Sequence, residues 1–166
     1  ARVKELGSDE NAALASADLL VAGTMTGSYR DTWSADSRLQ TIKERLSGGK
    51  ANRRYGYLEH KWTIPVKPGS SVVLYANVQT SATTDSFTFA YSTDNSKFIN
   101  MFAVNAGSSG PQQITLPASL NGTLYVRVSD NTRTAGQATS HTVQVDQLLV
   151  RSLNNADAAV PAAPSG

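Results

Sequence analysis

Polar and mainly apolar positions alternate along Leu58-Glu59-His60-Lys61-Trp62-Thr63-Ile64. Successive side chains of an extended strand point to opposite faces, so Leu58, His60, Trp62 and Ile64 share one face. The pattern predicts a strand with one buried face. It recurs at Val72–Val78, Phe87–Tyr91 and Leu124–Val128. Short alternating strands separated by turn residues predict an all-β fold, an antiparallel β-sandwich.

The composition limits the classes of partner. At 166 residues the chain is long enough for one domain with its own core. Only 17% of the residues are charged, and a net charge of +2 lacks the large basic face of nucleic-acid binders. The chain has no cysteine, and no segment approaches the roughly 20 apolar residues that cross a bilayer. We expect a monomer with neither a nucleic-acid nor a membrane partner.

The chain divides into a central module with linker-like ends. Residues 1–17 are polar and alanine-rich, and they are expected to form a linker or a short helix. The strand patterns occupy residues 18–152, and residues 153–166 form a Pro/Ala-rich tail typical of interdomain linkers. We interpret the chain as a module of a longer, secreted protein.

The boundaries of some strands are less clear. The first strand is expected from Leu19 to Met25, with a break at Gly27. The apolar residues of Leu39–Leu46 have helical spacing, but the all-β surroundings favour a strand there. Asn121-Gly122 is the strongest tight-turn signal in the chain.

The last expected strand, Thr142–Val150, changes phase within its length. Val143 and Val145 have one parity, and the apolar residues that follow have the other. Either the strand bulges at Asp146, or Asp146 points toward the apolar face. An inward carboxylate there needs backbone donors, an arginine or a metal.

The sequence shows no catalytic constellation. His60 shares a strand face with Trp62, and His141 precedes the last strand in a loop. A glycosidase needs two carboxylates across one cleft, and spacing alone does not place carboxylates such as Glu44 and Asp85 in that arrangement. Motifs of serine hydrolases, zinc proteases and phosphate-binding loops are missing. We expect a protein that is not an enzyme.

Aspartates in the expected loops are candidate metal ligands. Calcium takes about six to eight oxygen ligands, which sandwich loops supply from carboxylates and carbonyls. The best candidates are Asp36, Asp130 and Asp146, and their spacing matches no EF-hand. Two interpretations remain open: a structural calcium ion, or turn-forming aspartates that accept hydrogen bonds from their own backbone.

Aromatic residues in polar, loop-like sequence are candidate ligand contacts. Trp33, Tyr55 and Tyr57 offer flat apolar faces with a polar group, which suits stacking on sugar rings. Their expected polar partners for sugar hydroxyls are Arg53, Arg54 and Asp31. The alternative is that the aromatic rings fold back and close the ends of the sandwich.

Four segments resemble a known group of domains: Tyr57–Thr63, Phe87–Asp94, Leu124–Val128 and Val143–Leu148. Together they look like the accessory β-sandwich domains of bacterial secreted modular hydrolases. The closing Val-x-Val-Asp-x-Leu pattern is similar to the last strand of jelly-roll carbohydrate-binding modules, where an aspartate often lies near a structural calcium. The resemblance covers roughly Leu19 to Arg151.

The resemblance implies a jelly-roll β-sandwich that binds a polysaccharide outside the cell and keeps an attached catalytic domain close to it. The alternative is an interaction or stabilising module that packs on a partner domain and binds no glycan.

Overall fold

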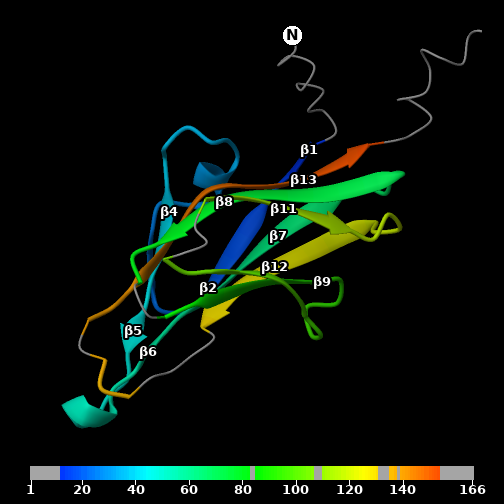
Figure 1. The fold of residues 1–166 in the computed structure, drawn as a ribbon. Helices are drawn as coiled ribbons and strands as arrows, with labels where there is room; N and C mark the ends of the chain where they lie inside the picture. The colour runs from blue at the N-terminus through cyan, green and yellow to red at the C-terminus, as the bar shows by residue number, and fades with distance from the viewer. Residues whose placement is uncertain (1–11, 83–84, 107–109, 131–134, 138, 154–166) are drawn as a thin grey trace, which may run out of the picture.

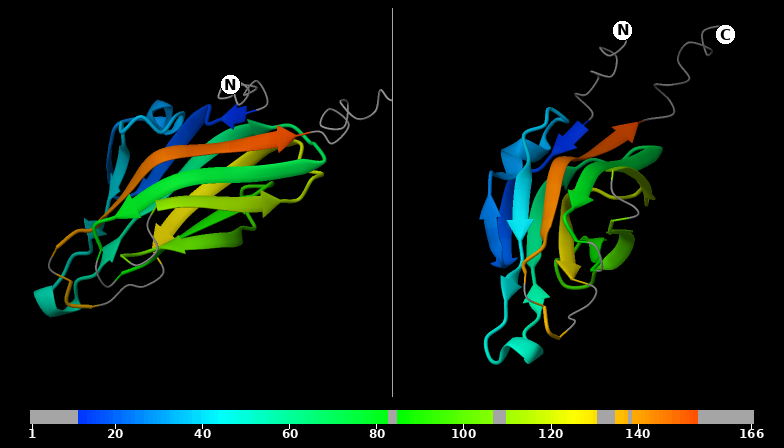
Figure 2. Two further views of the ribbon diagram at one scale, coloured as in Figure 1. Left: turned by 45° about the horizontal axis from the view of Figure 1, so that its top comes forward. Right: turned by 60° about the vertical axis from the view of Figure 1, so that its left-hand side comes forward.

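Two antiparallel sheets face each other across an apolar core in the computed structural model, which describes residues 12–82, 85–106, 110–130, 135–137 and 139–153 (Figures 1 and 2). Sheet A has the strand order β11-β8-β13-β4-β3, and β1 also pairs with β13. Sheet B has the order β10-β9-β12-β7-β2. The expected antiparallel β-sandwich is confirmed.

The strand bounds follow the alternation in the sequence. Sheet A consists of β1 (Ala12–Leu14), β3 (Thr24–Thr26), β4 (Gln40–Lys43), β8 (Ser71–Thr80), β11 (Gly110–Leu116) and β13 (Thr142–Leu153). Sheet B consists of β2 (Ala17–Ala22), β7 (Glu59–Val66), β9 (Phe87–Ser92), β10 (Ile99–Val104) and β12 (Gly122–Asp130). A small sheet pairs β5 (Arg45–Leu46) with β6 (Gly56–Tyr57), and two 3-10 helices are η2 (Tyr29–Thr32) and η3 (Ala51–Arg53).

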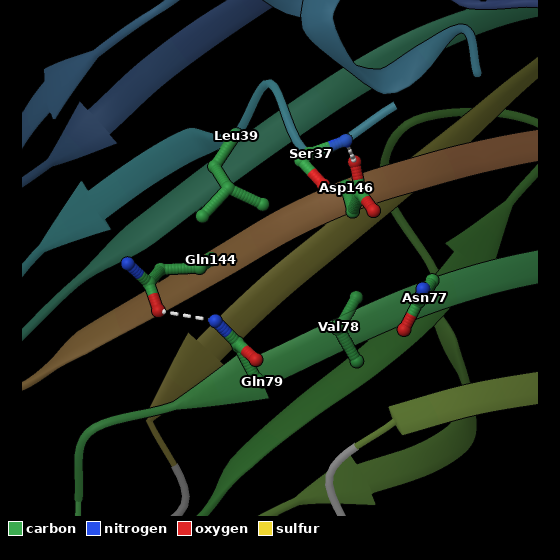
Figure 3. A pocket seen from close by; sticks show the side chains of 7 residues that line it. All are labelled: Ser37, Leu39, Asn77, Val78, Gln79, Gln144 and Asp146. Atoms are coloured by element: carbon green, nitrogen blue, oxygen red, sulfur yellow. Dashed lines mark hydrogen bonds between the residues drawn. The ribbon is translucent and has the colours of Figure 1, made fainter. Parts of the chain in front are cut away.

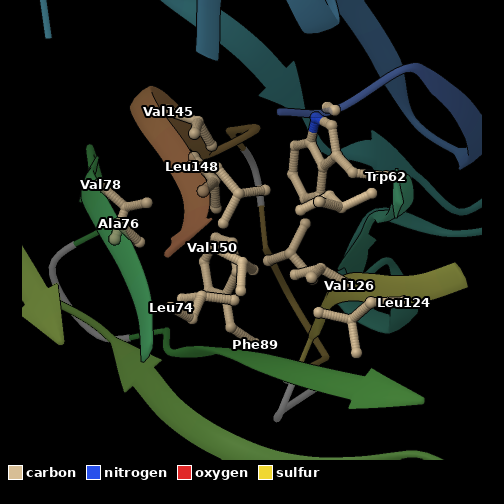
Figure 4. Packing of buried hydrophobic residues seen from close by; sticks show 14 of the residues in the cluster. Trp62, Leu74, Ala76, Val78, Phe89, Leu124, Val126, Val145, Leu148 and Val150 are labelled. Atoms are coloured by element: carbon tan, nitrogen blue, oxygen red, sulfur yellow. The ribbon is translucent and has the colours of Figure 1, made fainter. Parts of the chain in front are cut away.

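Aromatic rings fill the core between the sheets. Trp62, Phe87 and Phe89 are fully buried, as their strand positions predict. The Trp62 and Phe89 rings are nearly parallel at a centroid distance of 6.1 Å, and Phe102 stacks on Phe89 at 4.8 Å. Figure 4 shows apolar side chains of β8 and β13 facing these rings and the β12 residues Val126 and Leu124.

A polar network crosses one part of this core. His60 is fully buried, and its Nε2 lies 2.8 Å from Asp18 Oδ2. Gln40 donates to the same Asp18 oxygen at 2.6 Å and accepts the Trp62 indole N–H at 2.7 Å. Burial lowers the pKa of His60, an effect that the Asp18 carboxylate only partly offsets.

The chain changes sheets at Gly23, between β2 in sheet B and β3 in sheet A. Gly23 has φ of 108°, and a Cβ there would lie 2.5 Å from the carbonyl oxygen of Lys43. Only glycine fits such a position, because it lacks the side chain and tolerates positive φ. The expected strand is therefore divided at Gly23 into β2 and β3, and β3 ends at Thr26, directly before the expected break at Gly27.

Three further expectations are decided by strand pairing. Ala12–Leu14 lies in the expected linker or helix but forms β1, which pairs with β13. The ambiguous segment Leu39–Leu46 forms β4 and β5, so the strand interpretation is confirmed. The chain turns at Pro117–Leu120, where the Leu120 N–H donates to the Pro117 carbonyl at 3.2 Å, and not at the expected Asn121-Gly122, which leads into β12. This turn closes no hairpin, because β11 and β12 belong to different sheets.

The phase change in β13 is a bulge. Its register with β8 shifts between Val145 and Gln147. Asp146 therefore leaves the alternation, and its Oδ1 accepts the Ser37 backbone N–H at 3.0 Å. Of the two alternatives that the sequence left open, the bulge is confirmed.

Within the described residues, no helix is long and apolar enough to cross a membrane.

Candidate functional site

A cavity of about 480 Å³ opens at one end of the sandwich, between the β9–β10 loop and the segment that joins β11 to β12. Its lining combines an aromatic ring with apolar, hydroxyl and charged side chains. We call it the end groove; its residues are Tyr91, Ser92, Thr93, Asp94, Lys97, Ile99, Pro117, Ser119 and Leu120. A concave, largely apolar site with a few polar groups is the usual form of a small-molecule pocket.

The β9–β10 loop holds one carboxylate of this groove in place. Asp94 Oδ1 accepts hydrogen bonds from the backbone N–H groups of Lys97 (2.9 Å) and Ser96 (2.8 Å), and from the Ser92 hydroxyl (2.8 Å). These donors, with the Lys97 N–H the strongest, lower the pKa of Asp94 to about 2. The carboxylate is therefore charged and fixed in orientation at neutral pH.

Hydrogen bonds to the Ser92 side chain explain why the chain turns in this loop. Ser92 Oγ accepts the backbone N–H groups of Asp94 and Asn95, and Asn95 adopts φ of 60°. Asparagine tolerates this left-handed backbone better than most residues do. What the sequence did not indicate is that the loop, Tyr91 and Leu120 would enclose a groove.

A second, smaller pocket of about 190 Å³ lies on the outer face of sheet A (Figure 3). Its polar groups are largely paired with one another: Gln79 donates to Gln144 at 2.8 Å, and Asp146 accepts the Ser37 N–H. Leu39 and Val78 are its apolar lining residues, and no aromatic ring is among them. We therefore regard the end groove as the better site for a ligand with apolar ring faces.

Trp33 and Asp31 have structural contacts in the η2 loop. The Trp33 indole N–H donates to the Ala15 carbonyl at 2.8 Å, and its ring packs edge-on against Tyr29 at 6.1 Å. Asp31 accepts the Ser28 backbone N–H and so caps η2. Trp33 nevertheless keeps 38% of its surface exposed.

The other predicted ligand contacts lie together in the β5–β6 hairpin. The Tyr55 and Tyr57 rings are 5.7 Å apart and tilted by 49°. Arg53 is exposed at the end of η3, and Arg54 donates to the Gly49 carbonyl at 3.2 Å. Figure 1 shows this hairpin and η3 projecting from the sandwich, away from η2. The six predicted contacts thus form two separate groups.

The predicted metal ligands also separate. Asp36 accepts the Arg38 backbone N–H at 3.1 Å, next to Ser37, whose N–H donates to Asp146. Asp130 ends β12 in sheet B, opposite Phe87. Asp36 and Asp146 are therefore neighbours, whereas Asp130 lies in the other sheet.

A different set of ligand-type side chains does meet. Glu44, Asp85 and His141 offer one ligand atom each within 4.8 Å of one another, and we call them the Glu44 cluster. His141 Nδ1 lies 2.8 Å from Asp85 Oδ2 and 3.3 Å from Glu44 Oε1. Each of these residues could be noted in the sequence on its own. They are 41 and 56 positions apart, so no local pattern predicts that they meet.

No protein-family model and no curated protein matches the sequence. Among solved structures, a family 61 carbohydrate-binding module in complex with β-1,4-galactotriose matches with a TM-score of 0.52, over 84% of this chain and 90% of that one, at 9% identity. The chain has the fold of a carbohydrate-binding module. The jelly-roll β-sandwich that the resemblance implied is confirmed.

Other solved structures similar to the module are more distant. A chitosan-binding module from a chitosanase/glucanase of Paenibacillus sp. IK-5 has a TM-score of 0.45 and 13% identity, over 84% of this chain and 96% of that one. A family 32 module from a family 31 glycoside hydrolase of Clostridium perfringens has a TM-score of 0.44 and 11% identity, over 88% and 97%. At these identities the likeness is one of fold.

Proposed function

We propose that this chain is a non-catalytic module that binds a glycan in the end groove. The observation that carries the proposal is the fixed, charged carboxylate of Asp94 beside the Tyr91 ring in one concave site. Sugar rings present an apolar face and a rim of hydroxyls, so a pocket for them needs a flat apolar surface with oriented acceptors and donors.

Each part of the groove has a role in this proposal. Tyr91, Ile99 and Leu120 supply the apolar surface, and Ile99 keeps 57% of its surface exposed. Asp94 accepts sugar hydroxyls, and Lys97 donates to them. Because Asp94 is already oriented by backbone donors, little side-chain entropy is lost on binding.

In the parent protein, the module would hold a catalytic domain on its polysaccharide outside the cell. Tethering through a linker raises the effective concentration of the catalytic domain at the polymer. The Pro/Ala-rich residues 153–166 have the composition of such a linker.

The proposal is tested by measuring how the isolated module binds to insoluble polysaccharides (cellulose, chitin, xylan and starch) and to alginate. We expect depletion on one polymer, and a Kd that rises at least about tenfold in Lys97→Ala and Tyr91→Ala, since a tenfold change needs only about 1.4 kcal/mol. Lys97 is exposed, so its replacement leaves the fold intact.

Tyr55→Ala with Tyr57→Ala is the matched control, because it removes the aromatic pair that the sequence predicted as a binding surface. Loss of affinity in this control with full affinity in Lys97→Ala and Tyr91→Ala would move the site to the hairpin. A similar loss only in a Trp33→Ala variant would move it to the η2 loop. No depletion on any polymer would favour the alternative, an interaction module for a partner domain.

A calcium ion at Asp36 and Asp146 remains a prediction. The polymer assay, repeated with calcium and with a chelator, tests this prediction. If the ion is structural, its removal by the chelator should weaken binding to the polymer.

A further inference from the structure

The Glu44 cluster joins three segments that are distant in the sequence. Glu44 links β4 to β5, Asp85 precedes β9, and His141 precedes β13. The β4–β13 register pairs Lys43 with Thr142, so the next residues along, Glu44 and His141, are adjacent. Their backbones are also joined, because the Glu44 N–H donates to the His141 carbonyl at 2.9 Å.

The cluster contains a buried acceptor with no partner. Glu44 is only 2% exposed, and its Oε2 has no hydrogen-bond partner among the described residues. Its Oε1 accepts the Gln137 side-chain amide at 2.6 Å and the His141 backbone N–H at 2.9 Å. A buried carboxylate oxygen without a donor is costly, so a cation beside it is favourable.

The chemistry of the three groups selects the kind of cation. Two carboxylates and an imidazole nitrogen suit zinc and similar divalent transition metals, whereas calcium prefers about six to eight oxygen ligands. Two ligands on a tetrahedral zinc with bonds of about 2.0–2.2 Å lie about 3.3–3.5 Å apart. The separation of His141 Nδ1 from Glu44 Oε1, 3.3 Å, already has this value.

We propose that Glu44, Asp85 and His141 bind one divalent transition-metal ion of the zinc class. The ion takes the place of the proton between His141 Nδ1 and Asp85, and it binds the Glu44 carboxylate, whose Oε2 has no hydrogen-bond partner among the described residues. The Gln137 amide donates to Glu44 Oε1 at 2.6 Å and orients the carboxylate, as hydrogen-bond donors behind the ligands do in metal sites. The His141 side chain is 17% exposed, which leaves room for a water as the fourth ligand.

The ion has a structural role in this proposal, because it ties both sheets together at one end. Gly56 packs against the Gln137 side chain, because a Cβ on Gly56 would lie 2.4 Å from the Gln137 amide nitrogen. The site is also distant from the end groove: Ser92 is seven steps along the chain from Asp85, roughly 23 Å at about 3.3 Å per step of extended strand.

Thermal unfolding and calorimetric titration of the untagged module with ZnCl₂ test the proposal, with CaCl₂ and MgCl₂ in parallel. We expect one zinc per chain and a rise in Tm of about 5–10 °C at one hundred times Kd. Any response of Tm to calcium or magnesium should be the same in wild type and in His141→Gln, because these ions prefer ligand sets made of oxygen alone. In Co²⁺-loaded protein, a tetrahedral site also gives visible absorption.

The variants His141→Gln and Glu44→Gln should lose the zinc-dependent rise in Tm, and Asp146→Asn, which touches the other acidic pair, should keep it. His141→Gln changes a partly exposed side chain, so it folds even if Glu44→Gln does not. No zinc binding by the wild-type module, an equal calcium response that is lost in His141→Gln, or an unchanged zinc response in His141→Gln would overturn the proposal.

Discussion

At the scale of single residues, the least expected feature is a histidine in the middle of the core. His60 Nδ1 is buried and has no partner among the described residues. The neutral tautomer with its proton on Nε2 leaves no unpaired N–H, because Nε2 then donates to Asp18. Protonation would add a buried N–H and a charge, which is why burial lowers the pKa of His60.

This lowered pKa makes stability depend on pH with a definite sign. The unfolded chain takes up a proton at His60 below pH about 6.5, before the folded state does, so the free energy of unfolding falls as the pH drops. We expect wild type to lose up to about 1.4 kcal/mol per pH unit below 6.5 through this residue. His60→Gln keeps an N–H donor but cannot titrate, so urea unfolding at pH 7.5, 6.5 and 5.5 should show a shallower dependence. Parallel curves for the two proteins would contradict this assignment.

At the scale of the elements, single backbone positions decide where strands change sheet or register. At Gly23 the chain passes from β2 in one sheet to β3 in the other. Because β13 bulges at Asp146, its apolar residues point inward both before and after the bulge. Both features interrupt an alternation that is otherwise regular.

Gly23→Ala should be strongly destabilising. It combines a strained φ, worth about 1–3 kcal/mol, with a clash of the new Cβ against the Lys43 carbonyl. Gly122→Ala is the matched control, since Gly122 has φ of 105° but open space around a Cβ. Denaturant unfolding of both variants should therefore give a larger loss at Gly23, and equal losses would show that the clash is relieved at no cost.

At the scale of the whole molecule, both sheets share one core, so neither can keep its buried face alone. Trp62 of sheet B packs with Phe89, and β8 and β13 of sheet A cover them from the other side (Figure 4). Such a structure should unfold in one cooperative transition.

Far-UV circular dichroism and tryptophan fluorescence measure this cooperativity independently. In a Trp33→Phe background the only remaining tryptophan is Trp62, which is fully buried and reports on the core. We expect the two urea transitions to coincide within error. A fluorescence transition at lower urea than the dichroism transition would mean that the sheets separate before the strands are lost.

Much of the fold could be predicted from the sequence because the signal is local. Alternation placed Trp62, Phe87 and Phe89 in the core, and the phase change marked the bulge at Asp146. Ala12–Leu14 was missed because its three residues form a strand only by pairing with β13. The sheet switch at Gly23 was not predicted, since Gly23 and Gly27 both have positive φ and only the first lies between sheets.

The candidate sites were decided by tertiary structure. By itself, the sequence determined an all-β sandwich and the composition of its turns, because side-chain alternation and turn preferences act between near neighbours in the chain. Whether Tyr91 faces Leu120 across a groove, or Glu44 meets Asp85 and His141, depends on which strands pair and in which register. Those pairings join residues tens of positions apart, and their energies come from burial of the whole core.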